Sequence, residues 1–110
     1  MSIFSKIFNK RPKEGSAQFR LEAAKENHGR VIRYVTERIN ENDSVVGRGG
    51  ALTLKDGNFI IDTSADRLYV APATETDISK LMSGDGVVVK GKNTVDGKYH
   101  IYTVYFVYYR

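Results

Sequence analysis

Few residues of this chain belong to the types that perform catalysis or bind metal ions. There are two histidines, His28 and His100, and there is no cysteine among the 110 residues. The absence of cysteine excludes disulfides, thiolate nucleophiles and cysteine-ligated zinc. No carboxylate is linked to either histidine by a recognisable spacing, and two histidines alone cannot build a typical structural zinc site. The sequence therefore predicts no catalytic residue, no metal site and no cofactor.

Two short segments are similar to ligand-binding loops without completing either pattern. GRGG, residues 47–50, is rich in glycine like a phosphate-binding loop, but it has neither the Walker spacing nor a following Lys-Ser/Thr pair. DTSAD, residues 62–66, has alternating oxygen donors like a calcium loop, but Arg67 stands where that loop needs glycine. We interpret both segments as turns. An enzyme whose carboxylates meet only in space stays open as an alternative.

The carboxy-terminal segment KYHIYTVYFVYYR, residues 98–110, contains five of the seven tyrosines. Asp96-Gly97, just before it, predicts a hairpin with a two-residue loop, in which Lys92 faces Ile101 and Lys90 faces Thr103. Alternation then gives the hairpin one apolar face, which we predict to be core. Its members are Val87, Val89, Tyr102, Val104, Phe106 and Tyr108.

The opposite face of this hairpin is the candidate ligand surface or interface. Its candidate residues are Lys90, Lys92, Tyr99, Tyr105 and Tyr109. Lysines among aromatic rings are typical of a platform for single-stranded nucleic acid or another planar anion. The same rings are equally typical of cross-strand packing, or of a face covered by the amino-terminal helix or by a second copy of the chain. Because only two lysines accompany the rings, the sequence favours packing or cover and argues against nucleic acid as a partner.

The elements that must position this face begin with a clearer hairpin. In ALTLKDGNFIID, Asp56-Gly57 separates two apolar-rich runs and predicts a two-residue loop. Leu54 then faces Phe59 and Leu52 faces Ile61, so these four side chains share one face. An antiparallel sheet with one buried face follows.

The remaining segments complete a fold prediction. Ser16 predicts the start of a helix that ends near residues 27–29, and RVIRYVTERI is predicted as a strand. DISKLMSG predicts a second short helix near residues 77–83. We therefore predict a mainly β fold, an antiparallel β roll or small barrel, with one short helix at 77–83 and an amino-terminal helix. The alternative is an α+β fold with a long helix over 16–40.

The positive charge of the chain is concentrated near its start. Residues 1–30 contain seven Lys/Arg and three Glu, so 7 − 3 accounts for the whole net charge of +4. We expect residues 1–15 to be a basic flexible tail and residues 16–110 to be one compact domain. No transmembrane or export segment is predicted, which favours the cytoplasm. Four apolar residues of the tail offer a weak peripheral membrane contact: Ile3, Phe4, Ile7 and Phe8.

The stretch from residue 31 to residue 110 resembles a family of small bacterial proteins without an assigned function. The resemblance rests on RYVTER, GRGGAL, KLMSGDGVVVKG and YFVYYR, and LMSGDG together with YFVYYR is its specific part. It implies a compact β-rich domain similar to pleckstrin-homology-like barrels. It implies no catalytic residue. The basic first thirty residues lie outside it.

Taken together, these observations favour a non-enzymatic binding or interaction module. Its partner is expected to be another protein or a second copy of the chain. Binding of single-stranded nucleic acid or an anionic ligand on the tyrosine and lysine face is one alternative. An enzyme with spatially assembled carboxylates is the other.

Overall fold

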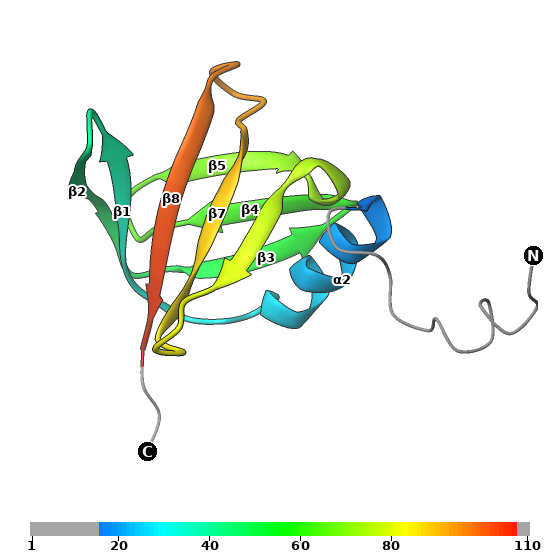
Figure 1. Ribbon diagram of the computed structural model, residues 1–110, viewed down its shortest axis with the longest axis horizontal. Coiled ribbons are helices and arrows are strands. Elements are labelled where there is room, and N and C mark those ends of the chain that lie inside the picture. The colour runs from blue at the N-terminus through cyan, green and yellow to red at the C-terminus, as the bar shows by residue number, and fades with distance from the viewer. Residues whose placement is uncertain (1–15, 108–110) are drawn as a thin grey trace, which may run out of the picture.

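A computed structural model describes residues 16–107 (Figure 1). The predicted flexible tail, the four apolar residues of the membrane contact, and Tyr108 and Tyr109 lie outside these residues. The elements follow in chain order: α2 (Ala17–Asn27), β1 (Ile32–Ile39), β2 (Asn42–Arg48), β3 (Ala51–Lys55), β4 (Asn58–Asp62), β5 (Arg67–Pro72), the 3-10 turn η1 (Ala73–Glu75), β6 (Asp77–Lys80), β7 (Gly86–Lys92) and β8 (Tyr99–Phe106).

The strands form two antiparallel sheets that pack as a roll, as predicted. One sheet has five strands in the order β2-β1-β8-β7-β6, and the other has three in the order β3-β4-β5. Figure 1 shows the strands of one sheet crossing those of the other at a steep angle. Such crossing sheets bury their facing side chains between them. The fully buried large side chains include Tyr69, Phe59, Ile32, Leu52 and Ile61.

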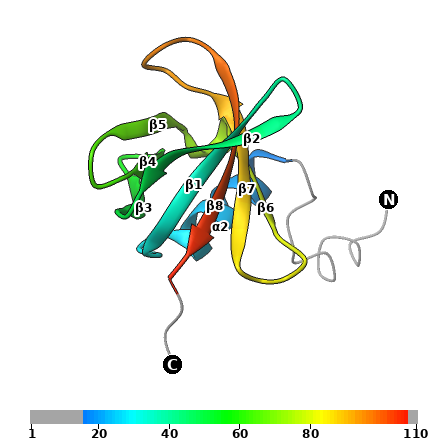
Figure 2. The same ribbon diagram turned by 90° about the vertical axis from the view of Figure 1, so that its left-hand side faces the viewer.

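Few hydrogen bonds join the two sheets, so the roll is not a closed barrel. At one seam, an isolated bridge pairs Val31 with Ala51, and the Leu52 N–H donates to the Arg30 carbonyl at 3.0 Å. At the other seam, the Thr94 N–H donates to the Val70 carbonyl at 2.9 Å. Helix α2 packs against η1, β6 and β3 (Figures 1 and 2). It therefore fills the side that the strands leave open.

The first predicted hairpin is confirmed residue by residue. Leu54 pairs with Phe59 and Leu52 pairs with Ile61. Both turn residues take positive φ values, 53° at Asp56 and 80° at Gly57. Two successive left-handed residues are what a tight two-residue hairpin requires.

The second hairpin forms with a different register. Lys92 pairs with Tyr99 and Lys90 pairs with Ile101, so each partner lies two residues earlier than predicted. Because the shift is an even number of residues, every side chain stays on its predicted face. The predicted core members within the described residues are all buried: Val87, Val89, Tyr102, Val104 and Phe106.

The predicted helix over 77–83 is wrong, because residues 77–80 form strand β6. Asp77 pairs with Lys90 and Ile78 pairs with Val89 on β7. The pairing buries Ile78 and leaves the next two residues exposed. The same apolar residue can serve a short helix or a strand, and an available sheet edge decides between them.

The alternative long helix over 16–40 is also wrong. The Ser16 side chain accepts a hydrogen bond from the Phe19 N–H at 3.1 Å, as expected of an N-cap. The helix ends at Asn27, and Gly29 has a φ of +87°. RVIRYVTERI then continues as a strand, as predicted. Within the described residues, no helix is long and apolar enough to span a bilayer.

Candidate functional site

The face of the five-stranded sheet that points away from the three-stranded sheet is the candidate site, and we call it the outer face. In Figure 1 it is turned toward the viewer, and no other described element lies in front of β8 and β7. Helix α2 reaches it at the β6 edge, where the Arg20 Nε lies 2.7 Å from an Asp77 carboxylate oxygen. The α2 helix therefore does not cover its tyrosines.

A pair of stacked tyrosines lies at one end of the outer face. The rings of Tyr34 and Tyr105 have centroids 4.6 Å apart and an interplanar angle of 30°. The two residues also pair across β1 and β8. Both are half-buried, so each ring supports the other and still reaches solvent. A stacked pair on an open sheet is a flat aromatic surface onto which another planar group can extend.

A β-bulge in β1 adds a cation beside this pair. Ile32 pairs with Phe106 and Tyr34 with Tyr105, so Arg33 is an extra residue opposite Tyr105. A bulge changes the direction of side chains locally, and the Arg33 guanidinium carbon lies 5.1 Å from the Tyr34 ring centroid. Arg48 pairs with Tyr34 from the other side, on β2. Tyr34 therefore has two exposed arginines next to it, Arg33 on its own strand and Arg48 on β2.

Cations outnumber carboxylates on the outer face. The cations are Arg33, Arg38, Arg48, Lys90 and Lys92, and the carboxylates are Asp43 and Asp77. Arg38 binds Asp43 at 3.2 Å, and Asp77 is held by Arg20. Among residues 16–107, the other four cations have no carboxylate within ion-pair distance.

The structure places four of the five predicted site residues on this one face. Lys92 and Tyr99 pair at the end next to the loop 93–98, and Lys90 follows them along β7. Tyr105 lies at the opposite end of β8, about 20 Å away for six residues of extended strand. The fifth, Tyr109, lies outside the described residues. That any of them binds a ligand stays a prediction.

Sequence reasoning missed the contribution of β1 and β2. Tyr34, Arg33 and Arg48 join the outer face only because β1 pairs with β8, far along the chain. The alternation of Tyr34, Thr36 and Arg38 in RYVTER indicates one polar strand face. It does not indicate which strand lies beside it.

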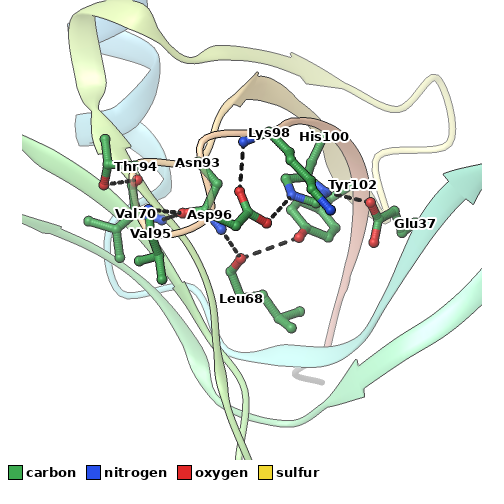
Figure 3. Close-up of polar contacts among 10 residues, drawn as sticks. All are labelled: Glu37, Leu68, Val70, Asn93, Thr94, Val95, Asp96, Lys98, His100 and Tyr102. Carbon is green, nitrogen blue, oxygen red and sulfur yellow. Dashed lines mark hydrogen bonds and ion pairs between the residues drawn. The ribbon is translucent and has the colours of Figure 1, made fainter.

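A second polar cluster surrounds His100 on the inner side of the sheet (Figure 3). The His100 Nδ1 lies 2.5 Å from a Glu37 carboxylate oxygen, and its Nε2 lies 2.8 Å from an Asp96 carboxylate oxygen. The imidazole also stacks on the Tyr102 ring, with centroids 5.1 Å apart. The His100 side chain is 14% exposed. The sequence spacing linked no carboxylate to this histidine, and the structure brings two carboxylates to it.

These contacts change the proton affinities of the cluster. Burial lowers the pKa of His100, but its hydrogen bonds to the Glu37 and Asp96 carboxylates outweigh this effect, so the pKa is raised above its ordinary 6.5. The Lys98 N–H and the His100 ring lower the pKa of Asp96. Burial, with the nearby Glu37 charge, raises the pKa of Tyr102 well above its ordinary value. Tyr102 therefore stays neutral, and its hydroxyl donates to the Leu68 carbonyl at 3.3 Å.

The cluster is poorly arranged for catalysis or metal binding. Both ring nitrogens of His100 already contact carboxylates, so neither is free to take a substrate proton or to bind a metal ion. Among residues 16–107, no three His, Cys, Asp or Glu side chains are grouped to hold a metal ion. The Nδ1 of the other histidine, His28, accepts a hydrogen bond from the Leu54 N–H at 2.8 Å.

Two hollows on the surface also lack paired carboxylates. One lies between α2 and the β6 edge and includes Arg20, Asp77 and Lys90 in its lining. The other lies at the end of β8 and includes Arg30 and Asp85. Each lining has one acidic residue, so neither hollow offers the pair of carboxylates that general acid–base hydrolysis uses.

Comparisons of the chain with protein-family models, with curated proteins and with solved structures find no match. The resemblance to small bacterial proteins with a pleckstrin-homology-like barrel therefore stays a prediction. The two features of the described residues that bear on function are the outer face, whose Arg33, Arg48, Lys90 and Lys92 have no carboxylate partner there, and the His100 cluster, whose ring nitrogens both contact carboxylates.

Proposed function

We propose that this chain is a non-enzymatic binding module, and that its outer face binds single-stranded nucleic acid. The observation that carries the proposal is the Tyr34–Tyr105 stack with Arg33 and Arg48 next to Tyr34, on a part of the sheet face that no described element covers. Bases stack on such rings whatever their sequence, and arginines beside the rings neutralise the phosphates.

The charge and length of the face support a flexible single strand as the ligand. Arg33, Arg48, Lys90 and Lys92 extend from one end of the face to the other without carboxylate partners among the described residues. A strip of about 20 Å has room for a few nucleotides, which is the site size of small single-strand binding folds. The two lysines visible in the sequence argued against nucleic acid, and Arg33 and Arg48 double the number of free cations.

A second candidate function is protein docking on the same face, through a second copy of the chain. Tyr99 is 62% exposed and Val45 is 48% exposed, so apolar surface remains at the loop end of β8 and on the edge strand β2. Cover by another protein would remove it from water. Light scattering of the full chain separates the two candidates, because a dimer closed over this face would leave no room for a strand.

The binding test uses a labelled single strand of about ten nucleotides, with a duplex of the same sequence beside it, measured by fluorescence anisotropy. The proposal predicts binding of the strand in preference to the duplex, with an affinity that falls steeply as salt rises. Absence of binding at about 50 mM salt, or equal affinity for the duplex, would contradict it.

Two sets of variants locate the site. Arg33→Ala with Arg48→Ala should weaken binding about tenfold or more, and should lower the salt slope by about 0.7 for each phosphate contact that is lost. Tyr105→Leu should cost about 1–3 kcal/mol of binding free energy for one lost stacking contact. The matched control is Lys55→Ala with Lys80→Ala, which removes the same charge from exposed positions outside the candidate set. An equal loss in this control would assign the affinity to net charge alone.

A further inference from the structure

The His100 cluster links the loop 93–98 to β8 and β1, two strands that already pair with each other. Glu37 comes from β1, His100 from β8, and Asp96 from the loop 93–98 that connects β7 to β8 (Figure 3). We propose that this cluster is a proton-operated latch: protonated His100 ties the loop to β1, and loss of its proton releases the loop. The proposal does not depend on nucleic-acid binding.

The geometry sets the number of protons that the latch needs. A carboxylate only accepts hydrogen bonds, so a ring nitrogen must carry a proton to bind one. With a carboxylate at 2.5 Å and another at 2.8 Å, both ring nitrogens donate only when the imidazole is positively charged. A neutral imidazole has one donor, and its other nitrogen then points a lone pair at a carboxylate. One of the two contacts must therefore open.

The contact that opens should be the one to Asp96. The Glu37 contact is shorter, and the Glu37 side chain is 18% exposed against 38% for Asp96. Asp96 also has another donor, because the Lys98 N–H binds its other carboxylate oxygen at 2.8 Å. A carboxylate that is more exposed to water and has a second hydrogen-bond donor loses less interaction free energy when the imidazole becomes neutral. The loop side of the cluster therefore releases first.

The charges that face His100 from the surrounding elements are few. β1 supplies Glu37, the loop supplies Asp96 with the Lys98 charge beside it, and β7 supplies the uncharged Gly91 directly opposite. The Tyr102 ring stacks below and is neutral, since burial raises the pKa of its hydroxyl. Two carboxylates therefore act on one imidazole, and within the described residues neither forms an ion pair with a lysine or arginine.

The loop is also anchored to β5, through its first two residues. The Asn93 side chain accepts from the Val70 N–H at 3.2 Å and donates to the Leu68 carbonyl at 3.0 Å, on β5. Thr94 adds two hydrogen bonds to the Val70 carbonyl. Beyond Thr94 the contact that ties the loop to another part of the sheet is Asp96 with His100. Within the loop, Val95, Gly97 and Lys98 also hydrogen-bond to Asn93. Opening the Asp96–His100 contact should therefore loosen residues 95–98 relative to β8 and β1 while Asn93 stays in place.

The sign of the pH dependence follows from the raised pKa of His100. A group with a higher pKa in the folded state contributes its full stability below its unfolded pKa, near 6.5. That contribution is lost as pH rises through the higher folded pKa. Asp96 has a lowered pKa and stays ionised throughout this window. The latch is therefore closed in mild acid and opens as pH rises through the raised pKa of His100.

The test is nuclear magnetic resonance on the full chain, between about pH 5.5 and about pH 8.5. The ring nitrogen shifts of His100 should report two protonated nitrogens at the acid end and a pKa above 6.5. Over the same range, order parameters from Cα relaxation should fall from rigid values of about 0.85 toward about 0.6 at residues 95–98, and stay high at Asn93. The signals of His28 are identified by their loss in His28→Asn.

Two variants and one control complete the test. Glu37→Gln keeps a hydrogen-bond acceptor but removes the charge, so it should lower the pKa of His100. His100→Gln should make the loop equally mobile at both ends of the pH range. Glu41→Gln, at the exposed β1–β2 turn, removes one acidic charge from the same hairpin and should change neither result. A His100 pKa at or below 6.5, or loop mobility that follows pH in His100→Gln as in the parent chain, would overturn the proposal.

Discussion

The two Asp-Gly hairpins of this protein contain the same dipeptide and build different loops. At Asp56-Gly57 both residues are left-handed, and the strands pair up to Lys55 and Asn58 on either side. At Asp96-Gly97 only the glycine has a positive φ, 72°, and pairing stops at Lys92 and Tyr99. Six residues, 93–98, therefore connect β7 to β8.

The difference lies in what the neighbouring strands offer. In the longer loop Asn93 is 5% exposed, and its side chain hydrogen-bonds to Val70, Leu68 and Val95. Asp96 binds His100 and the Lys98 N–H. These contacts to β5 and β8 replace the ladder pairs that a tight turn at Asp96-Gly97 would have added. A turn dipeptide determines the length and register of a hairpin loop only when no neighbouring strand binds the side chains of the loop residues.

Asn93→Ala, in the longer loop, should cause the largest loss of stability. It removes three hydrogen bonds of the Asn93 side chain. The part-buried Val70 N–H then has no acceptor, and the Leu68 carbonyl loses one of its donors. Buried groups without partners cost about 1–3 kcal/mol each, so we expect a loss of about 3 kcal/mol in unfolding free energy. Urea denaturation measures it. Asn58→Ala, after the short turn, should cost about 0.5 kcal/mol. Equal costs would mean that the long loop is not held by Asn93.

Gly91→Ala should cause the next largest loss of stability. A Cβ at Gly91 would lie 2.0 Å from the Tyr69 hydroxyl oxygen, and Tyr69 is fully buried and bonded to Thr76 at 2.8 Å. Overpacking of this kind costs about 1–3 kcal/mol, measured as a lower urea midpoint. In a Tyr69→Phe background, which lacks the hydroxyl, the same substitution should cost less. An unchanged cost in that background would place the clash elsewhere.

Gly57→Ala and Gly97→Ala should each cause a smaller loss of stability, and the two losses should be equal. Both glycines have positive φ, 80° and 72°, and a Cβ at either would meet no atom within 4 Å. Each substitution therefore costs only the left-handed backbone, about 1 kcal/mol by thermal denaturation. A clearly smaller cost at Gly97 would show that the longer loop can rearrange around alanine and that the shorter one cannot.

Asp96→Asn should have the smallest effect at neutral pH and a distinct one in acid. The pKa of Asp96 is lowered by the Lys98 N–H and by His100. Its stabilising contribution is therefore present above the unfolded pKa and lost as pH falls through the lower folded pKa. The parent chain should lose more stability than the variant on acidification through this range. Acid titration of unfolding free energy, followed by circular dichroism, gives the comparison, and parallel curves would contradict it.

The sequence was a good guide where the contacts are local. Asp56-Gly57 predicted the first register correctly, and the even shift in the second hairpin left its faces as predicted. Period-two alternation survives such a shift, whereas the register itself depended on Asn93 finding β5. The strand at 77–80 was missed because its edge position beside β7 is a property of the sheet and not of DISKLMSG.

The two polar clusters were predicted to different extents for the same reason. Lys90, Lys92, Tyr99 and Tyr105 lie on one hairpin, so alternation alone placed them on one face. Arg33, Tyr34 and Arg48 needed the pairing of β1 with β8, and Glu37 needed it to reach His100. Asp96 lies four residues before His100, yet that spacing predicts a contact in a helix and not across a hairpin loop.

The pairing of β1 with β8 also bears on how the chain folds. Ile32 meets Phe106, so the central strand pair of the larger sheet joins segments from near opposite ends of the described chain. Hairpins such as β3–β4 and β7–β8 form from neighbours within about 1–10 μs. The β1–β8 ladder must wait until the intervening chain has been brought together, at the cost of closing a long loop. Distant pairings of this kind slow folding into the millisecond-to-second range, so we expect both polar clusters to assemble in the last, rate-limiting step.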